Sequence, residues 1–90
     1  MGNSIKDFKK EINYVFGEVI DEANYKLLLN SEVDEDKVEA IIDEAVTAYE
    51  DFYEKINAGR KADNKKSYFK QLTIDVEAKV KELLNKIENL

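Results

Sequence analysis

Apolar side chains recur at steps of three and four residues through almost the whole chain, in three runs near residues 4–29, 34–57 and 63–89. This spacing places the apolar side chains of each run on one face of an α-helix, with charged side chains opposite. The links of about 4 and 5 residues suit antiparallel neighbouring helices. The pattern therefore predicts an all-α fold, an antiparallel up-down-up three-helix bundle formed by a single domain over residues 1–90.

The first run is interrupted by a glycine but keeps its period. Ser4 can accept a hydrogen bond from the free amides of the first turn, so the helix is expected to begin there. Asn30 is its predicted end, because asparagine tolerates the left-handed backbone that closes many helices. Gly17 costs about 1 kcal/mol against alanine inside a helix, and the alternative fold has four shorter helices with a break near this residue. Since the apolar period continues through Gly17, we favour an unbroken helix.

The second run has a clear start and a broad apolar face. Asp34 is the predicted N-cap, because Val33 and Val38 stand at the two positions of a hydrophobic staple. The apolar side chains spread over roughly 160° of the helix, which suits a middle helix that contacts both neighbours. Gly59 offers a C-terminal stop. The apolar set is Val38, Ile41, Ile42, Ala45, Val46, Tyr49, Phe52, Tyr53 and Ile56.

The third run resembles the seam of a coiled coil in its spacing. Either Asp63 or Asn64 is expected to cap its first turn. Its apolar residues follow one another at steps of three and four and predict a narrow stripe facing the other two helices. They are Phe69, Leu72, Val76, Val80, Leu83, Ile87 and Leu90.

The residue types that are missing exclude several classes of function. The 90 residues contain no cysteine and no histidine, which removes disulfides, cysteine and histidine zinc sites, and the usual nucleophile–histidine pairs. The three glycines lie far apart, so no phosphate-binding loop is present. Carboxylates on exposed helix faces lack the desolvation that would raise a pKa for acid catalysis. We therefore predict no enzyme activity, no cofactor, no metal site and no evident small-molecule substrate.

The start of the chain, MGNSIKDFKKEI, has no apolar stretch that would make a signal peptide or a membrane span. A cytoplasmic protein without a membrane partner is expected.

Charge is distributed unevenly along the chain, whose net charge is −6. Residues 30–57 carry 2 basic and 10 acidic side chains, whereas residues 58–90 carry 8 basic and 5 acidic ones. Five carboxylates of the second run align into an outward ridge about 27 Å long. One interpretation is a solvated face that keeps the protein soluble. The other is an acidic decoy or inhibitor that docks on a basic protein. This acidic ridge comprises Asp36, Glu39, Asp43, Glu50 and Glu54.

A basic patch surrounds the predicted turn into the third helix, with Tyr68 and Phe69 interleaved. Such a patch could contact phosphates while an aromatic ring stacks on a base, so nucleic-acid binding is an alternative function. The overall acidity opposes the approach of a polyanion, and Phe69 also belongs to the apolar seam. The patch comprises Arg60, Lys61, Lys65, Lys66 and Lys70.

Three large side chains do not fit the predicted core. Tyr14 and Tyr25 share a face of the first helix opposite its apolar stripe, and Ile74 lies on the polar side of the third. Tyrosine is favoured at interfaces, so we predict a contact surface at these residues. The resulting hypothesis is a small non-enzymatic helical module that acts by protein contact, with a homodimer as the simplest assembly.

Overall fold

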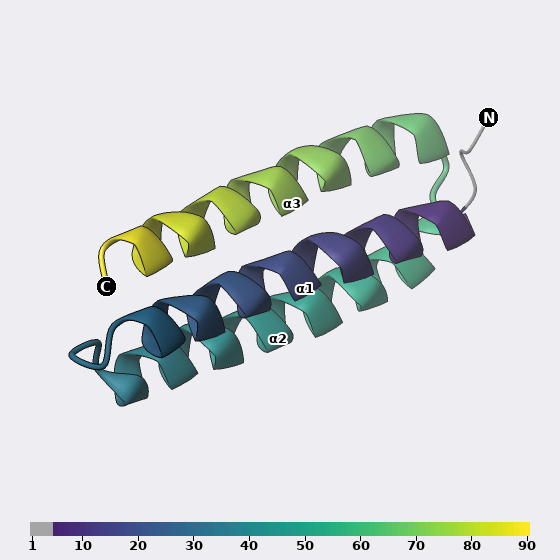
Figure 1. Cartoon of the computed structure of the whole chain (residues 1–90). Helices are drawn as coiled ribbons and strands as arrows, with labels where there is room; N and C mark the ends of the chain where they lie inside the picture. The colour runs from purple at the N-terminus through teal and green to yellow at the C-terminus, as the bar shows by residue number, and fades with distance from the viewer. Residues whose placement is uncertain (1–4) are drawn as a thin grey trace.

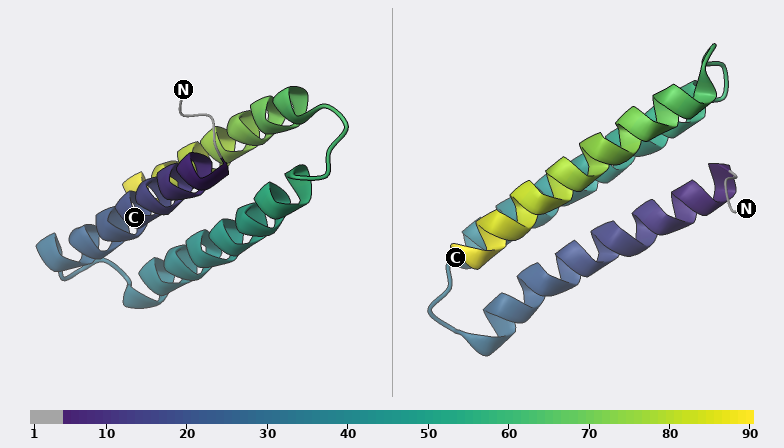
Figure 2. Two further views of the ribbon diagram at one scale, coloured as in Figure 1. Left: turned by 90° about the vertical axis from the view of Figure 1, so that its right-hand side faces the viewer. Right: turned by 90° about the horizontal axis from the view of Figure 1, so that it is seen from above.

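The computed structural model describes residues 5–90, which form three α-helices joined by two short turns (Figure 1). The helices are α1 (Ile5–Leu29), α2 (Glu35–Gly59) and α3 (Lys65–Glu88). α1 and α3 run in the same direction and α2 runs opposite to both, as two further views show (Figure 2). All three helices pack against one another, which confirms the predicted three-helix bundle. Because α1 continues through Gly17, the alternative of four shorter helices is wrong.

The starts of α2 and α3 are fixed by side-chain caps. The Asp34 carboxylate accepts a hydrogen bond of 2.9 Å from the amide of Asp36, as predicted. Asn64 rather than Asp63 caps α3, because its side-chain oxygen accepts a hydrogen bond of 3.0 Å from the amide of Ser67. These acceptors satisfy amides that have no partner inside their own helix. Ser4, the predicted cap of α1, lies outside the described residues.

The end of α1 is closed differently from the prediction. No non-glycine residue among those described has a positive φ, so the expected left-handed backbone at Asn30 is wrong. Instead, the Asn30 side-chain oxygen accepts a hydrogen bond of 3.0 Å from the amide of Glu32. Its carbonyl oxygen accepts another, of 3.1 Å, from the amide of Val33. Asn30 thus turns the chain through local side-chain bonding, a second property that makes asparagine common in turns.

Gly59 is the last residue of α2, as predicted, although its φ is not positive. It is buried, and a Cβ atom at this position would lie 2.6 Å from Cε1 of Tyr68 and 2.7 Å from Cζ of Phe69. Tyr68 also donates a hydrogen bond of 2.7 Å from its hydroxyl to the carbonyl oxygen of Lys55. The glycine is therefore required by the close approach of the first turn of α3, not by its own backbone angles.

The core lies where the three apolar stripes meet. Phe16 of α1 sits at its centre, with ring centroids 6.2 Å from Tyr49 and 6.1 Å from Phe52 of α2. From α3, Leu83 and Ile87 are almost completely buried. The breadth of the apolar face of α2 lets it contact both neighbours, as predicted. Val46, at the edge of that face, is an exception and remains 40% exposed.

A cluster of four charged side chains joins α2 to α3. Lys86 donates a hydrogen bond of 2.8 Å to Glu44, and Lys79 donates one of 3.4 Å to the same carboxylate. Both lysines also pair with Glu82, at 3.3 and 3.4 Å. The hydrogen bond from Lys86 holds the pKa of Glu44 below 4.5, and Lys79 lowers it further against a partial opposing effect of burial. Pairing with Glu82 and then Glu44 raises the pKa of Lys79 above 10.5.

These pKa shifts give the stability of the bundle a defined pH dependence. Because the folded pKa of Glu44 is lowered, its stabilising contribution is present above about pH 4.5 and is lost as the pH falls through the folded value. Replacing Glu44 with Gln is expected to lower the urea midpoint slightly at pH 7 but hardly at about pH 3. Glu50, an exposed carboxylate of α2 outside the cluster, provides the control as Glu50→Gln. An equal effect of Glu44→Gln at both pH values would contradict the ion-pair assignment.

Candidate interaction site

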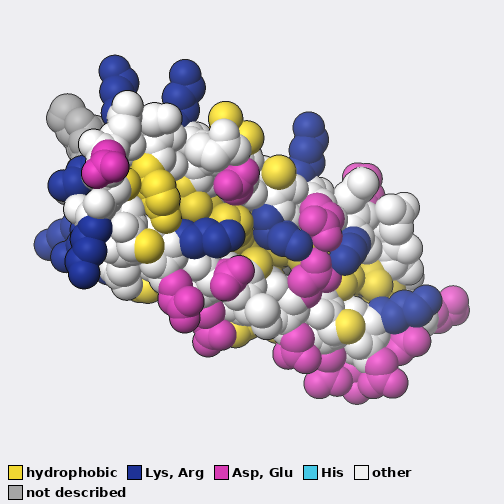
Figure 3. All heavy atoms as spheres, turned by 180° about the vertical axis from the view of Figure 1, so that it is seen from behind, with side chains coloured by type: hydrophobic (Ala, Val, Ile, Leu, Met, Phe, Trp, Pro, Cys, Tyr) yellow, Lys and Arg dark blue, Asp and Glu magenta, His cyan; other side chains and the backbone are white. Residues whose placement is uncertain are grey.

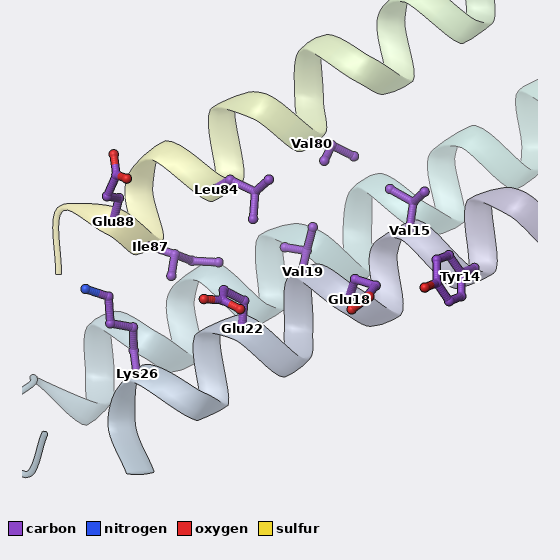
Figure 4. Close-up of a pocket in the computed structure, with 10 residues that line it drawn as sticks. All are labelled: Tyr14, Val15, Glu18, Val19, Glu22, Lys26, Val80, Leu84, Ile87 and Glu88. Atoms are coloured by element: carbon purple, nitrogen blue, oxygen red, sulfur yellow. The ribbon is translucent and has the colours of Figure 1, made fainter. Parts of the chain in front are cut away.

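An open groove lies between α1 and α3 on one side of the bundle. Two adjoining hollows of about 630 and 540 Å³ form it, and they share Val15 of α1 with Val80 and Leu84 of α3. The close-up in Figure 4 shows Val15 and Val19 on the side of α1, with Val80 and Leu84 on the side of α3. We call this feature the α1–α3 groove and define its apolar floor as Ile12, Val15, Val19, Val76, Val80 and Leu84.

The groove is open because the side chains along this seam are short. Aromatic rings fill the space between α1 and α2, where Phe16 packs on Tyr49 and Phe52. Between α1 and α3 the facing positions are largely valines, and Val15 and Val80 are only partly buried. A valine reaches less far than an aromatic ring, so part of the space between α1 and α3 stays unfilled. At the end where α1 begins, a ring contact of 5.5 Å between Phe8 and Phe69 joins the two helices.

The rim of the groove is predominantly acidic. Among the residues that line the two hollows, five are glutamates and two are lysines. The five carboxylates are exposed, and none forms an ion pair with another residue in 5–90. The rim therefore presents a negative potential on both sides of an apolar floor. The glutamates are Glu11, Glu18 and Glu22 of α1, with Glu77 and Glu88 of α3.

The two tyrosines predicted to form a contact surface lie beside this groove. Tyr14 is 68% exposed and lines the groove itself, and its side chain is visible in Figure 4. Tyr25 is also exposed. It is rotated about 20° from Tyr14 around the axis of α1 and lies about 16 Å farther along the helix. Leu29, one helical turn after Tyr25, is exposed as well. Ile74 is exposed on α3 but does not line the groove, so the structure separates it from the tyrosines.

Several exposed apolar side chains had no counterpart in the sequence prediction. Leu28 and Leu29 belong to the first apolar run, yet both are exposed at the end of α1. Leu84 directly follows the buried Leu83 and is turned about 100° away from it, toward α1. The signal available for Leu84 was its place outside the apolar stripe of α3, the same reasoning that identified Ile74.

The acidic ridge of α2 is exposed along its whole length. Figure 3 shows carboxylates gathered over the lower edge of the molecule, where α2 lies. None of the five ridge residues forms an ion pair with another residue of the described chain. The ridge thus keeps the free negative charge that the sequence predicted, on a different face from the α1–α3 groove.

The basic patch occupies the turn between α2 and α3. All five of its lysine and arginine side chains are exposed, and Figure 3 shows positive groups gathered at the corresponding end of the bundle. Tyr68 and Phe69, in contrast, are partly buried and pack on each other with ring centroids 5.4 Å apart. Both rings also approach Gly59. These rings pack between α2 and α3, so the patch presents positive charge without free rings for base stacking.

Within residues 5–90, no group of three or more acidic, histidine or cysteine side chains is arranged to hold a metal ion. None of the helices in this part of the chain is long and apolar enough to cross a membrane. In comparisons with known proteins, no protein-family model, curated protein or solved structure matches the chain.

Proposed function

We propose that this chain is a non-enzymatic helical module that binds a polypeptide through the α1–α3 groove and the adjoining tyrosine face of α1. The observation that carries the proposal is the juxtaposition of an apolar groove with the exposed side chains of Tyr14, Tyr25 and Leu84. Contiguous exposed apolar surface marks interaction sites on small proteins, and tyrosine is enriched in the centres of interfaces.

Covering this side of the bundle would also add to a small core. A domain of 90 residues buries a limited share of its surface, and many small domains gain stability by association. The groove leaves the side chains of Val15 and Val80 partly in contact with water. A partner that covers them removes apolar surface from water, which contributes about 25 cal/mol per Å² before the costs of association.

Self-association through the exposed tyrosine face of α1, outside the apolar floor of the groove, is the simplest contact to test, because symmetric dimers are the commonest assembly. Sedimentation velocity from low to high micromolar concentration tests it on the whole chain, whose monomer has a mass of 10.4 kDa. We expect a dimer that the double change Tyr14→Ser and Tyr25→Ser dissociates. Ile74→Ser, at an exposed position away from the groove, is the matched control. A monomer at every concentration would exclude self-association as the mode of contact.

The acidic ridge supports a second candidate, an acidic decoy for a basic protein. Its specific support is the row of five exposed carboxylates that lack ion-pair partners within residues 5–90. Charge reversal distinguishes the two surfaces, because Glu39→Lys with Asp43→Lys alters the ridge and leaves every residue lining the groove unchanged. Loss of a basic partner through this double change alone would favour the ridge.

A further inference from the structure

We propose that the α1–α3 groove is a receptor for one basic amphipathic α-helix of a partner protein. This inference rests on the proposed function and names the class of partner that fits the site. Three features of the groove support it: its shape, the charge of its rim, and the poor fit of a second copy of this chain.

The shape matches a helix. The lining residues extend from Phe8 to Lys26 along α1, which corresponds to about 27 Å or roughly five helical turns. On α3, Val76, Val80 and Leu84 succeed one another at steps of four residues and form a continuous ridge. A fourth helix can lay an apolar stripe with period i, i+3, i+4 and i+7 between such ridges. The groove thus has the length and the ridged apolar surface of a helix-binding site.

The rim selects a basic helix. The α1 side carries Glu11, Glu18 and Glu22 with Lys26, and the α3 side carries Glu77 and Glu88 with Lys81, so the rim is negative on balance along both sides. Because these carboxylates have no ion-pair partner in the described chain, a docked helix with lysine or arginine beside its apolar stripe would meet them on both flanks. Charge complementarity of this kind speeds association and rejects acidic helices.

A second copy of the chain fits the groove poorly. Facing two grooves across a two-fold axis brings the same rim glutamates together, which is electrostatically unfavourable. The outward face of α2 carries the acidic ridge and has the same sign of charge. The basic patch has the opposite sign, but it is a turn at the end of the bundle, and its rings, Tyr68 and Phe69, are committed to packing. A different polypeptide is therefore the better occupant.

Fluorescence anisotropy with labelled 18-residue peptides tests the inference on the whole chain. The probe peptide carries leucines at i, i+3, i+4 and i+7 flanked by lysines. A second peptide of identical composition has the leucine stripe scrambled, and a third has glutamate in place of lysine. We expect binding of the first peptide only, because the site needs both the stripe and the charge. Equal binding of the scrambled peptide would show nonspecific attraction between charges and overturn the inference.

Matched variants of the protein locate the binding surface. Leu84→Asp places a charge on the groove floor, and Leu28→Asp makes the same change at an exposed position of α1 outside it. Glu18→Lys with Glu22→Lys reverses two charges of the rim. Glu39→Lys with Asp43→Lys reverses two charges of the acidic ridge and so changes the net charge of the protein equally. We expect the two groove variants to weaken binding at least about tenfold and the controls to change it less than about twofold. Circular dichroism verifies that all variants remain folded.

The outcomes separate this inference from the proposed function. Absence of binding, or a loss caused by the ridge reversal instead of the rim reversal, overturns the helix-receptor assignment. A dimer that Leu84→Asp dissociates would show a second copy in the groove, which overturns it too. If the chain dimerises through the tyrosines and binds no peptide, the proposed function stands and the helix receptor fails. If the chain is a monomer and binds no peptide, both the proposed function and the helix-receptor inference fail.

Discussion

Replacing Leu83 with alanine is expected to lower the free energy of unfolding by about 3 kcal/mol, within the usual range of roughly 2–5 kcal/mol for a buried leucine. The Leu83 side chain, in the C-terminal part of α3, is 0% exposed, so the change removes its apolar contacts and leaves a cavity. In a domain of this size the loss corresponds to a fall in the melting temperature of at least about 10 °C. Thermal and urea unfolding followed by circular dichroism measure it.

Leu84 provides a control at the adjacent position of the same helix. Its side chain is 42% exposed in the α1–α3 groove, so Leu84→Ala is expected to change the free energy of unfolding by less than about 1 kcal/mol. The pair tests the rotation of α3 about its own axis, since a turn of about 100° would exchange the two environments. A larger loss for Leu84→Ala than for Leu83→Ala would contradict the structure.

Replacing Gly59 with alanine is expected to lower the free energy of unfolding by about 2 kcal/mol, although alanine is the better helix former. The new methyl group would collide with the rings of Tyr68 and Phe69, at 2.6 to 2.8 Å. Either the rings leave their positions or α3 moves away from α2, and the hydrogen bond from Tyr68 to Lys55 is weakened in both cases. Chemical unfolding of the variant measures the loss.

The control is the other glycine inside a helix of this bundle. A Cβ atom at Gly17 meets nothing within 4 Å, and its backbone is helical. Gly17→Ala is therefore expected to raise the free energy of unfolding by about 0.5–1 kcal/mol, chiefly because the unfolded chain loses conformational freedom. The same substitution thus has opposite signs at the two sites. Stabilisation by Gly59→Ala would disprove the close approach of the aromatic rings.

The helices could be predicted because their signal is local. The three- and four-residue period determines which residues can share a face, and the observed ends of all three helices lie within two residues of the predicted ones. The side-chain cap at Asp34 followed from its neighbours in the sequence. The reason for Gly59 could not be predicted in this way, because the rings that exclude a Cβ atom come from the next helix.

The candidate site was only partly accessible from the sequence. Exposure of Tyr14 and Tyr25 followed from the helical wheel of α1 alone. The groove depends on how far apart α1 and α3 lie, which the pattern of either helix does not contain. Val80 was therefore placed in the apolar stripe that faces the other two helices, although it forms part of the floor of an open seam.

The short side chains along this seam would set the stability of the bundle against the proposed recognition of a helix. Enlarging Val80 to leucine or phenylalanine would fill the groove from within and shield Val15 from water. The apolar surface of the groove would then be buried by the chain's own side chains, and little of it would remain for a partner helix to cover. If the groove receives a helix as proposed, a substitution that makes the isolated chain more stable here should make it a poorer receptor.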